Sequence, residues 1–185
     1  MRKVHVFDSI SLDGFFTDEK NDMTWAHKRD EEWNAFAGGN AGGDGELLFG
    51  RVTYEMMAAF WPTPQAAQML PDVAAGMNRM RKTVFSRTLD AVGWQNTALV
   101  KGDLVSEVTR MKQQAGPDMV ILGSGSIVSQ LTQGRLIDEY QLVVNPIILG
   151  KGRTLFETVD RKIGLTLTKT KAFKNGNVVL WYVPA

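Results

Sequence analysis

Two short apolar runs pass directly into helical patterns, and this feature restricts the possible folds more than any other. The run ELLFG (46–50) is followed at once by RVTYEMMAAF, and the run MVILG (119–123) is followed by SGSIVSQL. Apolar runs of four or five residues are typical of strands buried on both faces of a parallel sheet. A helix that joins two parallel strands makes a right-handed crossover. The pattern therefore predicts an α/β fold.

The other patterns extend this alternation along the chain. Strands are predicted at 4–9, 82–86, 97–100 and 140–150, with Pro146 marking an edge or a bulge. Helices are predicted from Asp30 to a break in the glycine-rich stretch 38–45, over 65–79, from an N-cap at Asp103 to Gly116-Pro117, and from the 119–123 strand to Gly134. The segments 165–173 and 178–183 alternate around Asn175-Gly176, a strong hairpin signal. We expect one three-layer domain over 1–185, with a mixed, mainly parallel sheet flanked by helices and a C-terminal antiparallel hairpin.

Composition narrows the classes of function. The net charge of +1 gives no charge-based case for a nucleic-acid or membrane-surface partner. The absence of cysteine excludes disulfides, thiolate nucleophiles and Cys-ligated metals, and two histidines, His5 and His27, argue against a histidine metal site. We expect His27 at the surface. The N-terminus lacks the apolar core of a signal peptide, and no stretch is long enough to span a bilayer, so we expect a cytoplasmic protein.

Glycine and phosphate-binding side chains follow the predicted strands. In an open α/β sheet, ligands bind at the carboxyl ends of strands, where helix N-termini present free N–H groups to anions. Gly50 permits a tight turn, and Arg51 and Thr53 fall in the first helical turn, where they could meet a phosphate. The alternative is an exposed arginine and a threonine that only caps the helix.

Two further strand ends carry similar signals. Gly123 and Gly125 would let the backbone approach a pyrophosphate, and Ser124 and Ser126 add hydroxyl donors, although a plain tight turn would look the same. At the third end, Ser86 and Arg87 could hold the 2′-phosphate that distinguishes NADPH from NADH, or form an ordinary turn. Three such ends in one sheet favour a dinucleotide.

Candidate substrate residues are more ambiguous. Asp30 precedes Trp33 by three residues, so its carboxyl could have a raised pKa and bind or protonate a heterocycle, or could be an N-cap. Asp13 is either a turn former or part of an active-site wall, and Trp25 either stacks on a flat ring or packs. The basic stretch GKGR (150–153) could face a substrate phosphate or be a solvated loop.

Five motifs in order carry a resemblance to a known family: SLDGFF, LLFGRVTYE, VFSRTL, ILGSGSIVSQL and DEYQLVVNPIILGKGRTLF. Together they span nearly the whole chain. The sequence resembles the dihydrofolate-reductase-like superfamily, and more narrowly the reductase half of the bifunctional riboflavin-biosynthesis deaminase-reductase and its stand-alone relatives. It departs from the bifunctional enzyme in lacking the zinc deaminase half.

The resemblance implies an NADPH site and a substrate pocket. The cofactor positions would be Ser9, Gly50, Arg51, Val52, Thr53, Ser86, Arg87, Gly123, Ser124, Gly125, Ser126 and Ile127. Asp13 and Asp30 would be the catalytic residues, and they would contact the substrate together with Trp25; the spacing of Asp30 resembles the acidic residue that contacts the pterin in dihydrofolate reductases.

The implied activity is hydride transfer from NADPH to a small heterocyclic or sugar-derived substrate, of the 5-amino-6-(5-phosphoribosylamino)uracil reductase type. Dihydrofolate reduction and a non-catalytic, nucleotide-binding regulatory role are the alternatives. The resemblance also favours a homodimer. Apolar residues near Asn145, Trp181 and Tyr182 would face the partner or belong to the core.

Overall fold

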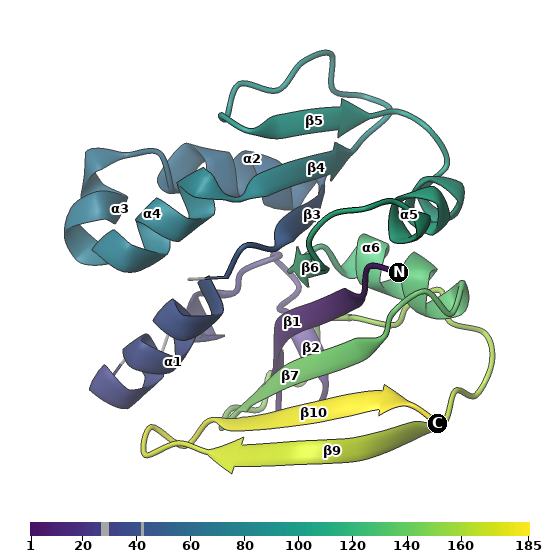
Figure 1. The fold of residues 1–185 in the computed structure, drawn as a ribbon. Helices are drawn as coiled ribbons and strands as arrows, with labels where there is room; N and C mark the ends of the chain where they lie inside the picture. The colour runs from purple at the N-terminus through teal and green to yellow at the C-terminus, as the bar shows by residue number, and fades with distance from the viewer. Residues whose placement is uncertain (27–29, 42) are drawn as a thin grey trace.

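The computed structural model describes residues 1–26, 30–41 and 43–185, so His27 lies outside the described residues. The main sheet has eight strands in the order β5-β4-β3-β6-β1-β7-β10-β9 (Figure 1). Their bounds are β1 (Val4–Ser11), β3 (Glu46–Gly50), β4 (Arg81–Phe85), β5 (Thr97–Val100), β6 (Met119–Leu122), β7 (Glu139–Asn145), β9 (Leu165–Ala172) and β10 (Val178–Pro184). Pairing is parallel from β5 to β7 and antiparallel for β10 and β9. The predicted mixed, mainly parallel sheet with a terminal hairpin is confirmed.

Helices cover both faces of the sheet (Figure 1). One face carries α1 (Glu31–Ala41), α2 (Arg51–Phe60), α3 (Pro64–Met69) and α4 (Pro71–Arg79), and the other carries α5 (Leu104–Gln113) and α6 (Gly125–Gln133). A short 3-10 turn, η1 (Thr24–Ala26), precedes α1. No helix among the described residues is both long and apolar enough to cross a bilayer.

The alternation of side chains along β1 divides the core between these layers. Val4 and Val6 are fully buried and pack in the cluster formed by α5, α6 and the sheet. Phe7 points to the opposite face, where it packs against the aromatic cluster that includes Trp33 of α1 and Trp181 of β10. Trp181 is thus a core residue in this structure. Burial of such large apolar side chains on both faces stabilises the central strands by about 1.5–3 kcal/mol for each fully buried side chain.

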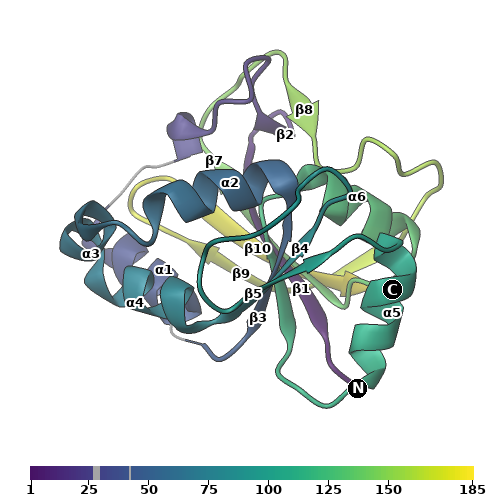
Figure 2. The same ribbon diagram turned by 90° about the horizontal axis from the view of Figure 1, so that it is seen from above.

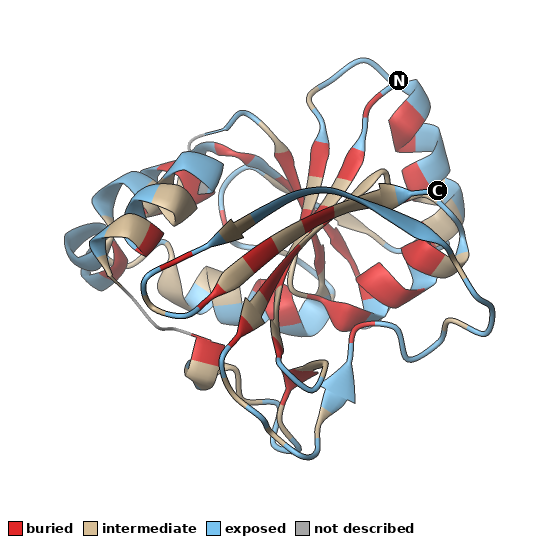
Figure 3. Ribbon diagram, turned by 90° about the horizontal axis from the view of Figure 1, so that it is seen from below, coloured by how far each residue is buried: buried red, intermediate tan, exposed pale blue. Residues whose placement is uncertain are grey.

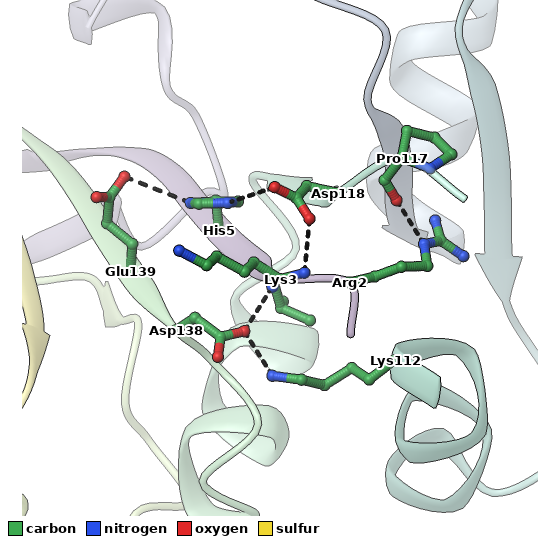
Figure 4. Close-up of polar contacts among 9 residues, drawn as sticks. Arg2, Lys3, His5, Lys112, Pro117, Asp118, Asp138 and Glu139 are labelled. Carbon is green, nitrogen blue, oxygen red and sulfur yellow. Dashed lines mark hydrogen bonds and ion pairs between the residues drawn. The ribbon is translucent and has the colours of Figure 1, made fainter. Parts of the chain in front are cut away.

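Polar groups fix the beginning of β1 between its neighbours (Figure 4). The Asp118 carboxylate accepts the Lys3 backbone N–H at 2.7 Å, and the Asp138 carboxylate accepts the Val4 N–H at 2.7 Å. The His5 ring lies between Asp118 and Glu139, at 3.6 and 3.4 Å. These contacts hold β1 in register between β6 and β7.

Prolines account for two differences from the predicted elements. The predicted helix 65–79 is two helices, because Leu70 precedes Pro71 and adopts φ −145° and ψ 67°, outside the helical region. The predicted strand 140–150 ends at Asn145, and β7 is a central strand with no bulge recorded in its pairing. Pro146 has no N–H with which to extend the ladder, so the strand stops before it.

The structure also differs from the predicted elements at the end of α1 and after the SLDG turn. Helix α1 continues through Gly38 and Gly39 to Ala41, beyond the predicted break. The segment after the SLDG turn forms a strand, β2 (Phe15–Thr17), which pairs with β8 (Arg153–Thr154) in a separate two-stranded sheet. Figure 2 shows this small sheet projecting from the main one. This pairing joins segments that are distant in sequence, so no local sequence pattern predicts it.

Candidate functional site

A cleft of about 1220 Å³ opens where β1, β3, β4 and β6 end. All of the residues predicted to hold the cofactor line it: Ser9, Gly50, Arg51, Val52, Thr53, Ser86, Arg87, Gly123, Ser124, Gly125, Ser126 and Ile127. They meet because β3 lies between β4 and β6, and β6 lies beside β1, all in parallel. The carboxyl ends of these strands therefore share one edge of the sheet.

A hydrogen bond joins two of the three junctions directly. The Gly50 backbone N–H donates to the Ser124 hydroxyl at 2.9 Å. Neither α2 nor α6 has a side-chain hydrogen bond at its N-cap residue. Two helix N-termini with uncapped first turns thus open onto the same cleft, an arrangement that suits an anion such as a pyrophosphate.

The backbone between β6 and α6 is tightly wound. Gly123 and Ser124 both adopt left-handed conformations, with φ of +63° and +65°. A Cβ on Gly125 would lie 2.7 Å from the ring of Phe16, closer than atoms can pack. A side chain at position 125 would therefore force the ring of Phe16 in β2 to move away from the start of α6.

The two predicted phosphate-binding arginines are both exposed at the cleft. The Arg51 guanidinium forms an ion pair with Glu55 at 2.9 Å, one turn along α2. Arg87 lies close enough to Asp103 for its charge to help lower the pKa of that carboxyl, after the larger effect of hydrogen bonds from Ser106. Exposed ion pairs are weak, so a phosphate could displace these partners at little cost.

Ser86 has a local role in the turn after β4. Its hydroxyl accepts the backbone N–H groups of Thr88 and Leu89 at 3.2 and 3.0 Å. This matches the ordinary-turn alternative for the hydroxyl, while the residue still lines the cleft beside Arg87.

The three predicted substrate residues are absent from the described residues that line the cleft. The Asp30 carboxylate accepts the Trp33 N–H at 2.7 Å, which is the N-cap arrangement. The Trp25 indole N–H donates to the Asp22 carbonyl at 3.0 Å. The geometry thus favours the structural alternative for Asp30, and it places Trp25 outside the cleft lining.

Asp13 fastens the SLDG turn to the loop before β8. Its carboxylate accepts the Ser11 hydroxyl at 2.6 Å and the backbone N–H groups of Leu149 and Gly150 at 3.1 and 2.7 Å. These bonds, that of Ser11 first, lower the pKa of the carboxyl. Asp13 is a turn former in this structure. Of the GKGR stretch, Arg153 does line the cleft, with its guanidinium 5.9 Å from the Phe16 ring.

Sequence reasoning missed Asp8, the buried carboxyl of the cleft. Asp8 is 4% exposed, it lines the cleft, and burial raises its pKa from 3.8 to about 7 despite a hydrogen bond from the Ser9 N–H. The sequence feature that could have indicated its burial is its alternation with Val4 and Val6, which places Asp8 on the same face of the predicted strand. No cluster of three or more metal-ligating side chains occurs among the residues that the structure describes.

The rest of the cleft wall is largely apolar. Phe16 from β2, Trp33 from α1, and Met56 and Met57 from α2 contribute to it. An apolar wall beside polar groups at the strand ends is typical of a site for a small organic ligand.

Comparison with known proteins gives matches over the full length. The model of the RibD C-terminal domain family matches residues 2–179. Among curated proteins, the chain is 24% identical to the uncharacterized protein YyaP of Bacillus subtilis, over 98% of this chain and 94% of that protein. It is 26% identical to the uncharacterized protein YwjB of the same organism, over 100% of this chain and 99% of that protein.

Solved structures with the same fold include three informative cases. A provisionally named riboflavin biosynthesis protein from Shewanella sp. PV-4 superposes with a TM-score of 0.74 at 22% identity, covering 99% of both chains. A deaminase/5-amino-6-(5-phosphoribosylamino)uracil reductase from Thermotoga maritima gives 0.68 at 12% identity, covering all of this chain and 57% of that one. Dihydrofolate reductase from Enterococcus faecalis, complexed with NADP(H), gives 0.65 at 13% identity, covering 98% of this chain and 96% of that one. The chain has a dihydrofolate-reductase-like fold and belongs to the RibD C-terminal domain family.

Proposed function

We propose that the protein is an NADPH-dependent reductase that transfers a hydride to a small heterocyclic or sugar-derived substrate, of the 5-amino-6-(5-phosphoribosylamino)uracil reductase type. The observation that carries this is the meeting of two uncapped helix N-termini, joined by the Gly50–Ser124 hydrogen bond, at a cleft with a largely apolar wall. Family membership supports it, and so does the likeness to a uracil reductase and to a dihydrofolate reductase complexed with NADP(H).

Each part of the cleft then has a task. The first turns of α2 and α6 bind the pyrophosphate through backbone N–H groups, with the hydroxyls of Thr53 and Ser126 beside them. Arg51 and Arg87 bind the 2′-phosphate. When bound, NADPH supplies the hydride; the residues of this chain orient both reactants and exclude water from the apolar part of the cleft.

Cofactor preference tests the assignment of the arginines. The double variant Arg51→Ala, Arg87→Ala should weaken NADPH binding at least tenfold more than NADH binding, because only NADPH carries the extra phosphate. Calorimetry with both nucleotides measures this. Arg110→Ala is a matched control, since Arg110 is an exposed helical arginine paired with Glu107 at 2.7 Å, outside the cleft lining. Equal losses for the two nucleotides would contradict the 2′-phosphate role.

Turnover distinguishes the proposed reaction from its alternatives. Oxidation of NADPH, followed at 340 nm, should occur with an aminouracil carrying a ribosyl or ribosylphosphate group. Oxidation with dihydrofolate instead would identify a dihydrofolate reductase, and cofactor binding without oxidation across the panel would favour a regulatory nucleotide-binding protein.

A homodimer belongs to the same proposal. Strand β9 is one of the two edge strands of the main sheet, and most of its residues are exposed (Figure 3), among them Leu165 at 39% and Leu167 at 47%. An edge strand with exposed leucines is a surface that a second copy can cover.

A further inference from the structure

Asp8 lies on the face of β1 that packs toward α6. Alternation along the strand puts it in phase with Val4 and Val6, which are fully buried in the cluster that also contains Ile127 of α6. Asp8 is itself 4% exposed, yet it forms part of the cleft wall. A carboxyl group that is buried from bulk solvent and lines the cleft is positioned to contact a ligand bound there.

The hydrogen bonding of Asp8 is incomplete. Its Oδ1 accepts the Ser9 backbone N–H at 2.9 Å, whereas Oδ2 has no hydrogen-bond partner among the described residues. The hydroxyl of Thr17, another buried residue of the cleft wall at 5% exposed, is also unpartnered there. The large majority of buried side-chain polar atoms in native proteins have a partner, so two without one in a single cleft point to a ligand that supplies it.

Few charges face Asp8 from the elements packed against β1. Strand β2, strand β6, turn η1 and helix α6 contain no titratable side chain. Strand β7 contributes two titratable residues, Glu139 and Tyr140. Glu139 pairs with His5, which points to the other face of β1 from Asp8. The Tyr140 hydroxyl donates to Thr132 at 2.9 Å.

Two further groups of charges lie on neighbouring elements. Arg153 of β8 lies over the Phe16 ring and is paired with Glu157 at 3.0 Å. Glu31 and Glu32 belong to α1, on the opposite face of the sheet, where Glu32 pairs with Lys171 at 3.5 Å. Burial, with no ion-pair partner for Asp8 among the described residues, raises the pKa of its carboxyl to about 7.

We propose that Asp8 is the proton donor of the reduction, acting on a substrate whose carbon–nitrogen or carbon–oxygen double bond accepts the hydride, with the Thr17 hydroxyl as a second hydrogen-bonding group for that substrate. This inference rests on the proposed function. NADPH, which the residues at the three strand ends would hold, would supply a hydride with its electron pair to the substrate carbon and would be released as NADP⁺. The π electrons of the double bond move to the heteroatom, which takes the proton from the Asp8 carboxyl. The Asp8 carboxylate is reprotonated from water after product release.

The chemistry fits the environment. A carboxylic acid that is neutral near the working pH is a suitable general acid, and general acid catalysis contributes about 10²–10⁴-fold to a rate. Neutral Asp8 also suits an uncharged reacting group on the substrate, because the apolar wall contributed by Phe16 and Ile127 disfavours a fixed charge beside the carboxyl.

The test compares three full-length proteins: wild type, Asp8→Asn and the control Asp90→Asn. The control makes the same change at a fully exposed side chain outside the cleft lining. Single-turnover oxidation of NADPH is measured with the aminouracil panel from pH 5 to 9, and cofactor binding is measured by calorimetry. We expect the wild-type rate to fall about tenfold per pH unit above pH 7. Asp8→Asn should be slower by about 10²-fold or more and lose this dependence, with NADPH affinity within threefold of wild type. Asp90→Asn should match wild type.

A second measurement needs no variant. Titration of ¹³C-labelled aspartate carboxyls by NMR in wild type should reveal one group titrating near pH 7, and the single-turnover rate should follow that titration. Turnover by Asp8→Asn at the wild-type rate, or a wild-type rate independent of pH between 6 and 9, would overturn the role of Asp8 and leave the reductase intact. Wild type that binds NADPH but oxidises it with no member of the panel would overturn the proposed function and this inference with it.

Discussion

Replacing Asp8 by asparagine should stabilise the protein in a pH-dependent manner, and this can be measured without any substrate. The substitution keeps the size of the side chain and an oxygen that can accept the Ser9 N–H. It removes the group whose ionisation is opposed by burial. Any difference in stability that changes with pH then reports the titration of Asp8.

The sign and size of the change in stability follow from the pKa of Asp8. Burial raises the pKa of Asp8 from 3.8 in the unfolded chain to about 7 in the folded protein. Below pH 3.8 both states hold the proton, and the native state has its full stability. As pH rises toward 7 the unfolded chain releases the proton first, so wild-type stability falls, and above pH 7 the loss is complete. The full shift corresponds to about 4 kcal/mol, of which roughly 2.5 kcal/mol falls between pH 5 and pH 8.

Urea unfolding of the apoprotein at pH 5, 6, 7 and 8 measures this for wild type, Asp8→Asn and Asp90→Asn. The difference in free energy of unfolding between Asp8→Asn and wild type should increase in favour of the variant by roughly 2.5 kcal/mol from pH 5 to pH 8. The m-values of the two proteins should be similar. The Asp90→Asn curve should run parallel to wild type, because Asp90 is fully exposed. Parallel curves for Asp8→Asn and wild type would show that Asp8 ionises as an ordinary aspartate, and the reasoning from its burial would be refuted.

Three other substitutions test separate parts of the structure. Gly125→Ala should lower the free energy of unfolding by about 1–3 kcal/mol in urea, because its Cβ would lie 2.7 Å from the Phe16 ring, and a wild-type midpoint would contradict that close approach. Lys82→Ala should lower the free energy of unfolding by about 2–4 kcal/mol, because the buried Lys82 ammonium donates to backbone carbonyls at the end of α4 and lies 4.3 Å from the ring centroid of Trp94. Thermal unfolding monitored by tryptophan fluorescence measures this change, and an unchanged midpoint would refute the stabilising role of Lys82. Leu167→Glu should convert the proposed dimer to a monomer in sedimentation velocity, whereas a wild-type monomer, or a dimer unaffected by the change, would exclude this interface.

The residues proposed to bind the cofactor could be predicted from sequence to lie together because they follow the ends of strands. Each junction is a local pattern, an apolar run and then a turn or a helix, and the parallel arrangement brings adjacent strand ends to one edge. Arg51, Arg87 and Gly125 therefore line one cleft although they are far apart in the chain. The terminal hairpin was predictable for the same reason, since its Asn-Gly turn is a local signal.

The buried acidic residue of the cleft, Asp8, could not be chosen from sequence. Asp13, Asp30 and Asp8 all lie near elements that border the site, and each could have been buried, capped or exposed. The structure ties Asp13 to Leu149 and Gly150, 136 and 137 residues away, and uses Asp30 to cap α1. Neither outcome follows from neighbouring residues in the chain.

The amino-acid sequence alone determined the α/β class, the chain order of the eight strands of the main sheet and the three strand ends, because hydrophobic period, turn residues and proline act over a few residues. Only the tertiary structure decided that β2 pairs with β8, that Phe16 approaches Gly125, and that the carboxyl of Asp8 is left without a partner for one oxygen. Burial and pKa depend on every element that packs around a group, and those elements come from distant parts of the chain.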